Sequence, residues 1–170
     1  MSRAAIGLGT NIGDRLSNLQ FAVDSFLLLP KTQVLSVSEV YETEPVGAVT
    51  DQPKFLNAVL LIETDLSPLT VLGACLGIEA AAGRKRLVKD GPRVLDLDLL
   101  FYENVKSETA ELTLPHPRIM QRAFVLVPLN DLFPSGRAPG LSFGSAYKNA
   151  DKSGVTPTNL KLQSKENIYG

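Results

Sequence analysis

The order of strand-like and helix-like segments in this 170-residue chain predicts an α+β fold, a ferredoxin-like two-layer sandwich with helices packed on an antiparallel sheet. Two observations carry this prediction. Amphipathic segments with three-and-four spacing, typical of helices, alternate with short apolar runs typical of strands. The resulting order is strand–helix–strand–strand–helix–strand, with strands expected at residues 4–8, 34–41, 55–64 and 94–102.

Both expected helices begin at residues that suit a helix N-terminus. Asp14 suits the N-cap of the first helix, which Pro30 ends. Ser67 and Pro68 suit the N-cap and N1 positions of the second helix, which Gly83 ends. The spacing predicts that the buried faces are formed by Leu16, Leu19, Val23, Phe26 and Leu27 in the first helix and by Leu69, Leu72, Leu76 and Ala80 in the second.

The remaining segments are expected to be loops, one short helix and a tail. Residues 44–54 and the basic residues 84–92 are expected to form long loops, and a short helix is expected within residues 119–129. Residues 134–170 are rich in Ser, Gly, Asn, Lys and Pro and show little periodicity, so we expect weak order in much of this stretch. We therefore expect a core domain over residues 1–133, followed by a C-terminal segment that is partly ordered and packs on or trails from the same domain.

The overall composition favours a cytoplasmic globular protein. A formal net charge of -1 gives no sign of a nucleic-acid or membrane partner. No apolar stretch approaches the ~20 residues that span a bilayer, and the first residues do not resemble a signal peptide. The one cysteine, Cys75, lies in an apolar helical segment, where we expect it to pack in the core.

Two carboxylates in the last predicted strand give the first indication of chemistry. Asp96 and Asp98 are two positions apart in a strand, so both side chains project from the same face, while the leucines between and around them project from the other. Two adjacent carboxylates repel each other unless a cation lies between them. Oxygen ligands of this kind suit Mg²⁺, which takes one or two carboxylates together with substrate phosphates. The sequence therefore predicts a magnesium–nucleotide site for phosphoryl-group transfer.

A basic stretch lies directly upstream of this pair. Five of the 17 basic residues fall within residues 84–93, and guanidinium groups there could bind phosphate oxygens bidentately. A solvated surface loop is the alternative interpretation. Gly91 and Pro92 favour a fixed backbone before Arg93. His116, between two prolines, fits a structural turn at least as well as a catalytic role.

Several motifs, taken in order, resemble those of the 6-hydroxymethyl-7,8-dihydropterin pyrophosphokinase family. Residues 89–100, KDGPRVLDLDLL, resemble its signature. The resemblance covers roughly residues 2–133, and its further motifs are residues 7–14, 41–45, 52–58, 114–118 and 122–129.

This resemblance implies an activity and its partners. The family transfers the terminal pyrophosphoryl group of ATP to the hydroxymethyl oxygen of the dihydropterin, releases AMP and acts in folate biosynthesis. Asp96 and Asp98 would bind two Mg²⁺ ions, and Arg84 and Arg93 would contact ATP phosphates and assist transfer, so these four residues would be catalytic. We expect a monomer with small-molecule substrates, no nucleic-acid or membrane partner, and possible association with neighbouring folate enzymes.

The resemblance also assigns two sets of binding residues. The ATP-binding set is Arg84, Arg93, Leu99, Thr113, His116, Arg122 and Glu79, with adenine read by the backbone of Leu99 and Thr113. The pterin-binding set is the backbone of Thr43, Glu44 and Val46 and the side chains of Phe55, Asn57 and Phe124. The chain departs from residues that a family member can carry at Leu76, Asp90, Glu111 and Pro117.

Two other functions are alternatives on this fold. A non-catalytic ferredoxin-like module that binds nucleic acid through the basic loop would need aromatic residues on exposed strands, and aromatic residues are only 6% of this chain. A different magnesium-dependent phosphotransferase on the same fold is disfavoured by Phe55, Asn57 and Phe124, which suit a flat heterocycle.

Overall fold

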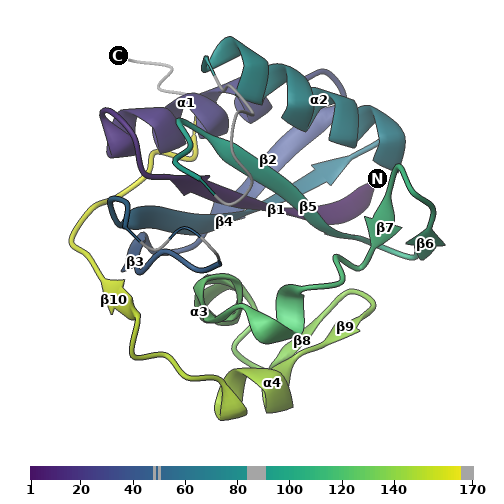
Figure 1. Cartoon of the computed structure of the whole chain (residues 1–170). Helices are drawn as coiled ribbons and strands as arrows, with labels where there is room; N and C mark the ends of the chain where they lie inside the picture. Colours follow the sequence, from purple (N-terminus) through teal and green to yellow (C-terminus); the bar gives the residue numbers. More distant parts are fainter. Residues whose placement is uncertain (48, 50, 84–90, 166–170) are drawn as a thin grey trace.

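The computed structural model describes residues 1–47, 49, 51–83 and 91–165. Its centre is an antiparallel sheet with strand order β10-β3-β4-β1-β5, in which β2 also pairs with β4 (Figure 1). The strands are β1 Ser2–Thr10, β2 Thr32–Val37, β3 Tyr41–Thr43, β4 Phe55–Thr64, β5 Asp96–Tyr102 and β10 Val155–Pro157. The observed order from β1 to β5 is βαβββαβ, because the second predicted strand is divided into β2 and β3. This order and the antiparallel pairing confirm the predicted ferredoxin-like α+β class.

Helices cover both faces of the sheet. Helices α1 (Arg15–Leu27) and α2 (Pro68–Ala81) lie on one face, as predicted. Helices α3 (Ala123–Leu132) and α4 (Gly144–Asn149) lie on the other face and add a third layer (Figure 1). The smaller elements are β6 Ser107–Glu108, β7 Thr113–Leu114, the 3-10 turn η1 Ile119–Gln121, β8 Arg137–Ala138 and β9 Leu141–Ser142.

The predicted helix N-termini are confirmed. The Asp14 carboxylate accepts a hydrogen bond from the Ser17 N–H at 3.1 Å, and the Ser67 hydroxyl accepts one from the Thr70 N–H at 3.2 Å. Each bond satisfies a backbone donor that the first turn of a helix leaves unpaired.

The predicted core face of α2 is wrong for Leu69, Leu76 and Ala80, whereas Leu72 packs against the core as predicted. Its buried residues are Val71, Cys75 and Glu79, whereas the side chains of Leu69 and Leu76 are 52% and 47% exposed. Leucine, alanine and glycine surround this helix almost evenly, so apolar spacing could not identify the buried side. Cys75 does pack in the core as expected, and burial raises the pKa of its thiol to about 12.

The strand expected over residues 34–41 is two strands. β2 and β3 both pair with β4, at different stretches of its length. Between them the Ser38 N–H donates to the Val59 carbonyl and the Ser38 hydroxyl accepts from the Val59 N–H, both at 2.9 Å. A side chain therefore takes over one position of the ladder and ends β2. β5 begins at Asp96 rather than Val94.

The two faces of the sheet carry separate hydrophobic clusters. The first packs under α1 and α2 and includes Leu97 and Leu99; the second packs under α3 and includes Leu100 and Phe101. A register shift in the β1–β5 pairing leaves Leu100 as an extra residue, so that the consecutive Leu100 and Phe101 both join the second cluster.

Residues 134–165 correct the expectation of weak order. They form the β8–β9 hairpin, α4 and β10, and β10 extends the central sheet by pairing with β3. Leu162 is 9% exposed and joins the first cluster. Backbone hydrogen bonds to β3 hold β10 in place, and such bonds require no hydrophobic periodicity in the sequence. The composition of this stretch therefore suggested disorder. The proposed domain boundary after residue 133 stays a prediction.

Candidate active site

Asp96 and Asp98 project from the face of β5 that looks toward α3. Their pairing partners on β1 are Gly9 and Gly7, so no side chain from β1 stands between the carboxylates and the space below the sheet. Leu97, between them, is 5% exposed and packs in the first hydrophobic cluster, on the other face of the sheet. The predicted alternation is therefore present in the structure.

Each carboxylate has a guanidinium partner. Arg93 Nη1 lies 2.9 Å from Asp96 Oδ2, and Arg122 Nη1 lies 3.6 Å from Asp98 Oδ2. Burial and the neighbouring Asp96 charge raise the pKa of Asp98 to about 6, with the two arginines opposing the rise and Glu79 adding to it. Two partly buried carboxylates are thus held side by side, and as a consequence Asp98 ionises less readily.

The position of Arg93 is set by Asn11, which is 2% exposed. Asn11 Oδ1 accepts from the Arg93 N–H at 2.7 Å, the Asn11 N–H donates to the Arg93 carbonyl at 3.0 Å, and Asn11 Nδ2 donates to the Pro53 carbonyl at 2.9 Å. One buried amide therefore ties the start of β5 to the loop before β4. This agrees with the expectation that the backbone before Arg93 is fixed.

The carboxylate pair fits a hard divalent cation that brings other ligands with it. Within the described ranges of the chain, no group of three His, Cys, Asp or Glu residues could hold a metal ion. Two carboxylates are the usual protein contribution to Mg²⁺ when phosphates and water supply the remaining oxygens. The donor set is therefore consistent with Mg²⁺ bound together with a nucleotide.

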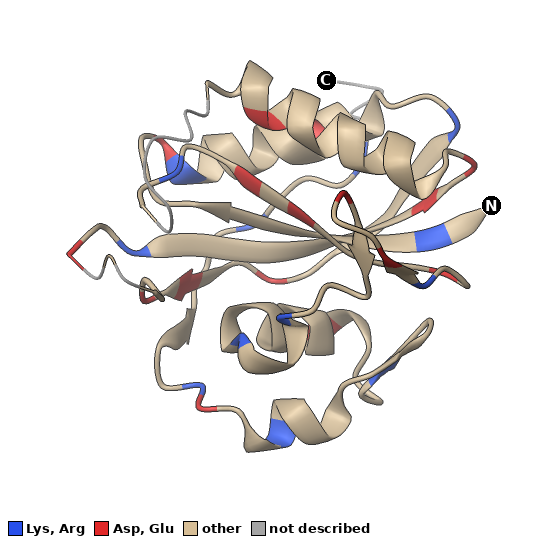
Figure 2. Ribbon diagram, turned by 45° about the vertical axis from the view of Figure 1, so that its right-hand side comes forward, with Lys and Arg blue, Asp and Glu red and all other residues tan. Residues whose placement is uncertain are grey.

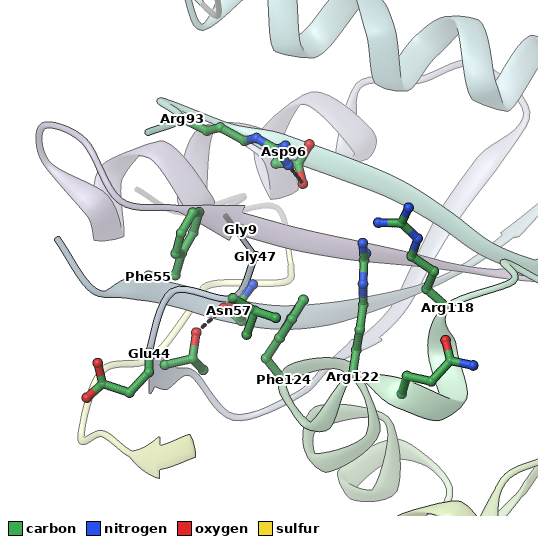
Figure 3. Close-up of a pocket in the computed structure, with 13 residues that line it drawn as sticks. Gly9, Glu44, Gly47, Phe55, Asn57, Arg93, Asp96, Arg118, Arg122 and Phe124 are labelled. Atoms are coloured by element: carbon green, nitrogen blue, oxygen red, sulfur yellow. Dashed lines mark hydrogen bonds and ion pairs between the residues drawn. The ribbon is translucent and has the colours of Figure 1, made fainter. Parts of the chain in front are cut away.

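A pocket of about 230 Å³ opens beside Asp96. Phe55 from β4 and Phe124 from α3 lie on opposite sides of it, with Asn57 between them (Figure 3). Aromatic faces with a polar group between them suit a flat heterocycle. The lining residues are Gly9, Thr43, Glu44, Val46, Gly47, Phe55, Asn57, Arg93, Asp96, Arg118, Gln121, Arg122 and Phe124.

The amide of Asn57 is oriented by two neutral hydrogen bonds. Its Oδ1 accepts from the Thr43 hydroxyl, and its Nδ2 donates to the Leu8 carbonyl at 3.2 Å. An amide has two donor hydrogens and two acceptor lone pairs, so these bonds use one donor and one acceptor site. Asn57 is therefore aimed before a ligand arrives.

Several pocket residues were not identified from the sequence. Gly9 belonged to a G-x-G-x-x-x-G run that fails the dinucleotide-binding pattern, yet a Cβ at this position would lie 2.9 Å from Asn57 Nδ2. Its conformation is ordinary, so the close approach, rather than the backbone, requires glycine. Arg118 and Arg122 reach from the α3 side toward β5 (Figure 3), and of these two only Arg122 was predicted as a site residue. Arg118 is the last residue of the predicted motif 114–118, and Gln121 directly precedes the motif 122–129, which was the available signal.

Other predicted site residues lie around this pocket without lining it. The Glu79 carboxylate is buried and accepts from the Leu97 N–H at 2.8 Å, between the two aspartates. Leu99 is buried in β5, and Thr113 lies in β7. Arg84 lies outside the described residues.

His116 follows β7 and is half-buried beside the arginines. Its Nδ1 accepts from the Arg118 N–H at 3.2 Å, so the neutral ring carries its proton on Nε2. Burial, then the charges of Arg122 and Arg118, lower the pKa of this imidazole. It is therefore a neutral donor near pH 7.

Charge is concentrated where these elements meet. Acidic residues lie in β5, and basic residues lie on the segment below it (Figure 2).

Among the described residues, no helix is long and apolar enough to cross a membrane.

Comparison with known proteins gives a consistent result. A family model described as 7,8-dihydro-6-hydroxymethylpterin-pyrophosphokinase (HPPK) matches residues 5–134. A 2-amino-4-hydroxy-6-hydroxymethyldihydropteridine pyrophosphokinase from Methylorubrum extorquens is 44% identical over 155 residues, covering 91% of this chain and 98% of the relative. The protein of the same name from Pseudomonas aeruginosa is 40% identical over 139 residues, covering 82% and 85%.

Fused relatives are also found. The mitochondrial folate synthesis bifunctional protein of Pisum sativum is 43% identical over 129 residues, which are 24% of its length. A crystal structure titled as HPPK-DHPS in complex with substrates matches with a TM-score of 0.64 at 14% identity, covering 86% of this chain and 43% of that chain. At this identity the structural likeness supports the fold alone, and this chain spans less than half of that fused protein.

Proposed function

Because the chain belongs to the 7,8-dihydro-6-hydroxymethylpterin-pyrophosphokinase family, it is an ATP-dependent diphosphotransferase of folate biosynthesis, and we propose that the pocket between β4, β5 and α3 is its active site. One observation carries this proposal: Asp96 lines the same pocket as Phe55, Asn57 and Phe124. A nucleotide–metal edge and a heterocycle pocket therefore adjoin. Family membership decides against a nucleic-acid module and against an unrelated phosphotransferase.

The reaction joins the two substrates at this junction. The hydroxymethyl oxygen of the dihydropterin attacks the β-phosphorus of ATP, the bond from that phosphorus to the oxygen bridging to the α-phosphorus breaks, and AMP leaves. The hydroxyl proton is released. Arg93 and Arg122 would bind phosphate oxygens, and this role is supported by the reach of both guanidinium groups into the pocket beside the carboxylates.

The pterin ring would lie between Phe55 and Phe124, with its polar edge on Asn57. Backbone groups of Thr43, Glu44 and Val46 would complete this recognition. The Glu44 N–H already donates to the Gly154 carbonyl at 3.0 Å, so Glu44 would offer its carbonyl oxygen instead. These contacts fix the hydroxymethyl group toward Asp96.

Members of the family generally use Mg²⁺ with ATP, and we assign two ions to Asp96 and Asp98. When bound, Mg²⁺ neutralises phosphate charge and orients the hydroxyl nucleophile. Arg93 and Arg122 pair with these carboxylates in the structure and can turn to phosphate oxygens once the carboxylates have cationic partners.

The remaining ATP contacts are assigned to the margin of the pocket. His116 would donate its Nε2–H to a phosphate, Leu99 and Thr113 would read adenine through their backbones, and Arg84 would bind phosphate. We also assign Glu79 to the ATP site. We further propose a monomer that acts in the cytoplasm and associates with neighbouring folate enzymes. The relatives named as folate synthesis bifunctional proteins support the association.

The direct test is chromatographic separation of nucleotides after incubation with ATP, Mg²⁺ and 6-hydroxymethyl-7,8-dihydropterin. We expect AMP and the pterin diphosphate in equal amounts, and neither when the pterin is omitted or Mg²⁺ is chelated. Formation of ADP in place of AMP would indicate transfer of a single phosphoryl group and would contradict the proposal.

A further inference from the structure

Residues 154–158, here called the strap, lie along the outer edge of β3 next to the pocket. The register pairs Val155 with Thr43, and the Glu44 N–H donates to the Gly154 carbonyl at 3.0 Å. A Cβ at Gly154 would lie 3.4 Å from the Glu44 side chain, so the strap also packs against that side chain. The end of β3 is thus held by β4 on one side and by the strap on the other.

The far end of the strap is anchored in the body of the protein. The N–H and hydroxyl of Thr158 both donate to the Val40 carbonyl, at 3.1 and 2.7 Å. Just beyond, Leu162 enters the first hydrophobic cluster, and the Gln163 N–H donates to Gln20 Oε1 on α1 at 2.8 Å. The strap is therefore a fixed support and not a loose end.

No strap residue lines the pocket, yet Thr43 and Glu44, at the supported end of β3, do. Thr43 in turn donates its hydroxyl to Asn57 Oδ1, so the strap reaches the central amide of the pocket through a single intermediate. We propose that the strap is a positioning element that holds the Thr43–Glu44 wall and thereby sets the affinity for the flat heterocyclic substrate. This inference rests on the proposed function of the pocket, and the strap lies outside the residues 5–134 that the family model matches.

The ladder offers a matched pair of variants at one residue. Hydrogen bonds at Glu44 and Thr158 flank the Thr156–Glu42 pair at even spacing, which puts Thr156 at a hydrogen-bonded position. Pro157 falls at a non-hydrogen-bonded position, where a proline costs no ladder bond. Thr156→Pro therefore removes a ladder donor, whereas Thr156→Ala keeps it and changes only an exposed side chain.

Steady-state kinetics of both variants separate positioning from general stability. We expect Thr156→Pro to raise KM for the pterin at least about fivefold, with KM for ATP and kcat within about twofold of wild type. Thr156→Ala should match wild type in all three. Equal losses for both substrates, or no change in Thr156→Pro, would overturn the inference.

A reciprocal measurement uses the unmodified protein and does not depend on the variants folding. If the strap favours heterocycle binding, the heterocycle must stabilise the strap by the same factor. Amide hydrogen exchange at Glu44 and Thr158 should slow on adding 6-hydroxymethyl-7,8-dihydropterin, and not on adding ATP and Mg²⁺ alone. Pterin that binds without slowing these amides would refute the strap role, whereas a failure of pterin to bind at all would refute the proposed function.

Discussion

Two parts of the pocket are held in opposite ways. The carboxylate edge is formed by two ion pairs, Arg93–Asp96 with an N···O distance of 2.9 Å and Arg122–Asp98 with one of 3.6 Å. At the amide wall, formed by Thr43 and Asn57 with the facing Gly9, neutral hydrogen bonds fix one buried amide. The ion pairs of the carboxylate edge must be exchanged when a charged substrate binds. The hydrogen bonds of the amide wall, in contrast, are already formed without a ligand. In the proposed site, preorganisation would serve the neutral heterocycle, and exchangeable charge would serve the phosphates.

The largest effect is expected from neutralising the carboxylate edge. Asp98→Asn keeps the size of the side chain but removes a charge that the phosphate-bound cation requires, so AMP formation should fall by at least about a hundredfold. Asp96→Asn should behave alike. Glu103→Gln is the matched control, because Glu103 follows the same strand and pairs with Arg3 far from the pocket. Turnover within threefold of wild type in either aspartate variant would exclude the metal assignment.

The next effect concerns the amide wall alone. Gly9→Ala would place a methyl group 2.9 Å from Asn57 Nδ2 and displace the amide, so pterin affinity should fall about tenfold while ATP affinity holds. Gly7→Ala is the control on the same face of β1, because the nearest contact of its methyl group would be the Leu100 side chain at 3.5 Å, an ordinary van der Waals distance. Calorimetric titration of both ligands measures the result. A parallel loss of ATP affinity would show that the two parts are not independent.

The carboxylate edge could be predicted from the local sequence, whereas the amide wall could not. Strand alternation is a local property, so the shared face of Asp96 and Asp98 could be predicted from two positions. Phe55 and Asn57 lie on β4, but Phe124 lies in α3 and Asp96 on β5, and only a family resemblance joined these distant segments. The need for glycine at Gly9 depends on contact across two strands and left no local signal.

The errors in the predicted fold have a related cause. Leu69 and Leu76 were assigned to the core because α2 is apolar on nearly every side, and its buried side is decided by the sheet beneath it. The order of residues 134–165 comes from pairing with β3 and from the burial of Leu162, which composition does not report. Helix caps, in contrast, depend on neighbouring residues, and they were predicted correctly.

A smaller effect is expected at the backbone that carries the carboxylate edge. Glu79 accepts the Leu97 N–H between the two aspartates, on the strand that ends the sheet. Glu79→Ala should lower kcat about tenfold and raise the Mg²⁺ requirement, because supporting hydrogen bonds of metal ligands are typically worth about that much. Glu79→Gln keeps an acceptor and should recover most of the activity.

Val71→Ala controls for lost packing on the same buried side of α2. If Glu79→Gln is as impaired as Glu79→Ala and the loss lies in KM for ATP, the carboxylate acts on the nucleotide rather than on the strand.

The smallest expected effect is a loss of folding stability that arises at the carboxylate edge and not at the amide wall. Without ligands the pKa of Asp98 is raised to about 6 from an ordinary value of 3.8, so between these pH values the folded protein holds a proton that the unfolded chain releases. Stability must then fall as pH rises through this window, and the cost is complete above it. Asp98→Asn should raise the Tm at pH 7 in EDTA by at least about 2 °C, a gain that vanishes near pH 4. Asn57→Ala, which breaks neutral bonds, should lower Tm equally at both pH values. If Asp98→Asn stabilised equally at pH 4 and pH 7, the cost would come from packing, and the carboxylate edge would differ from the amide wall in shape rather than in charge.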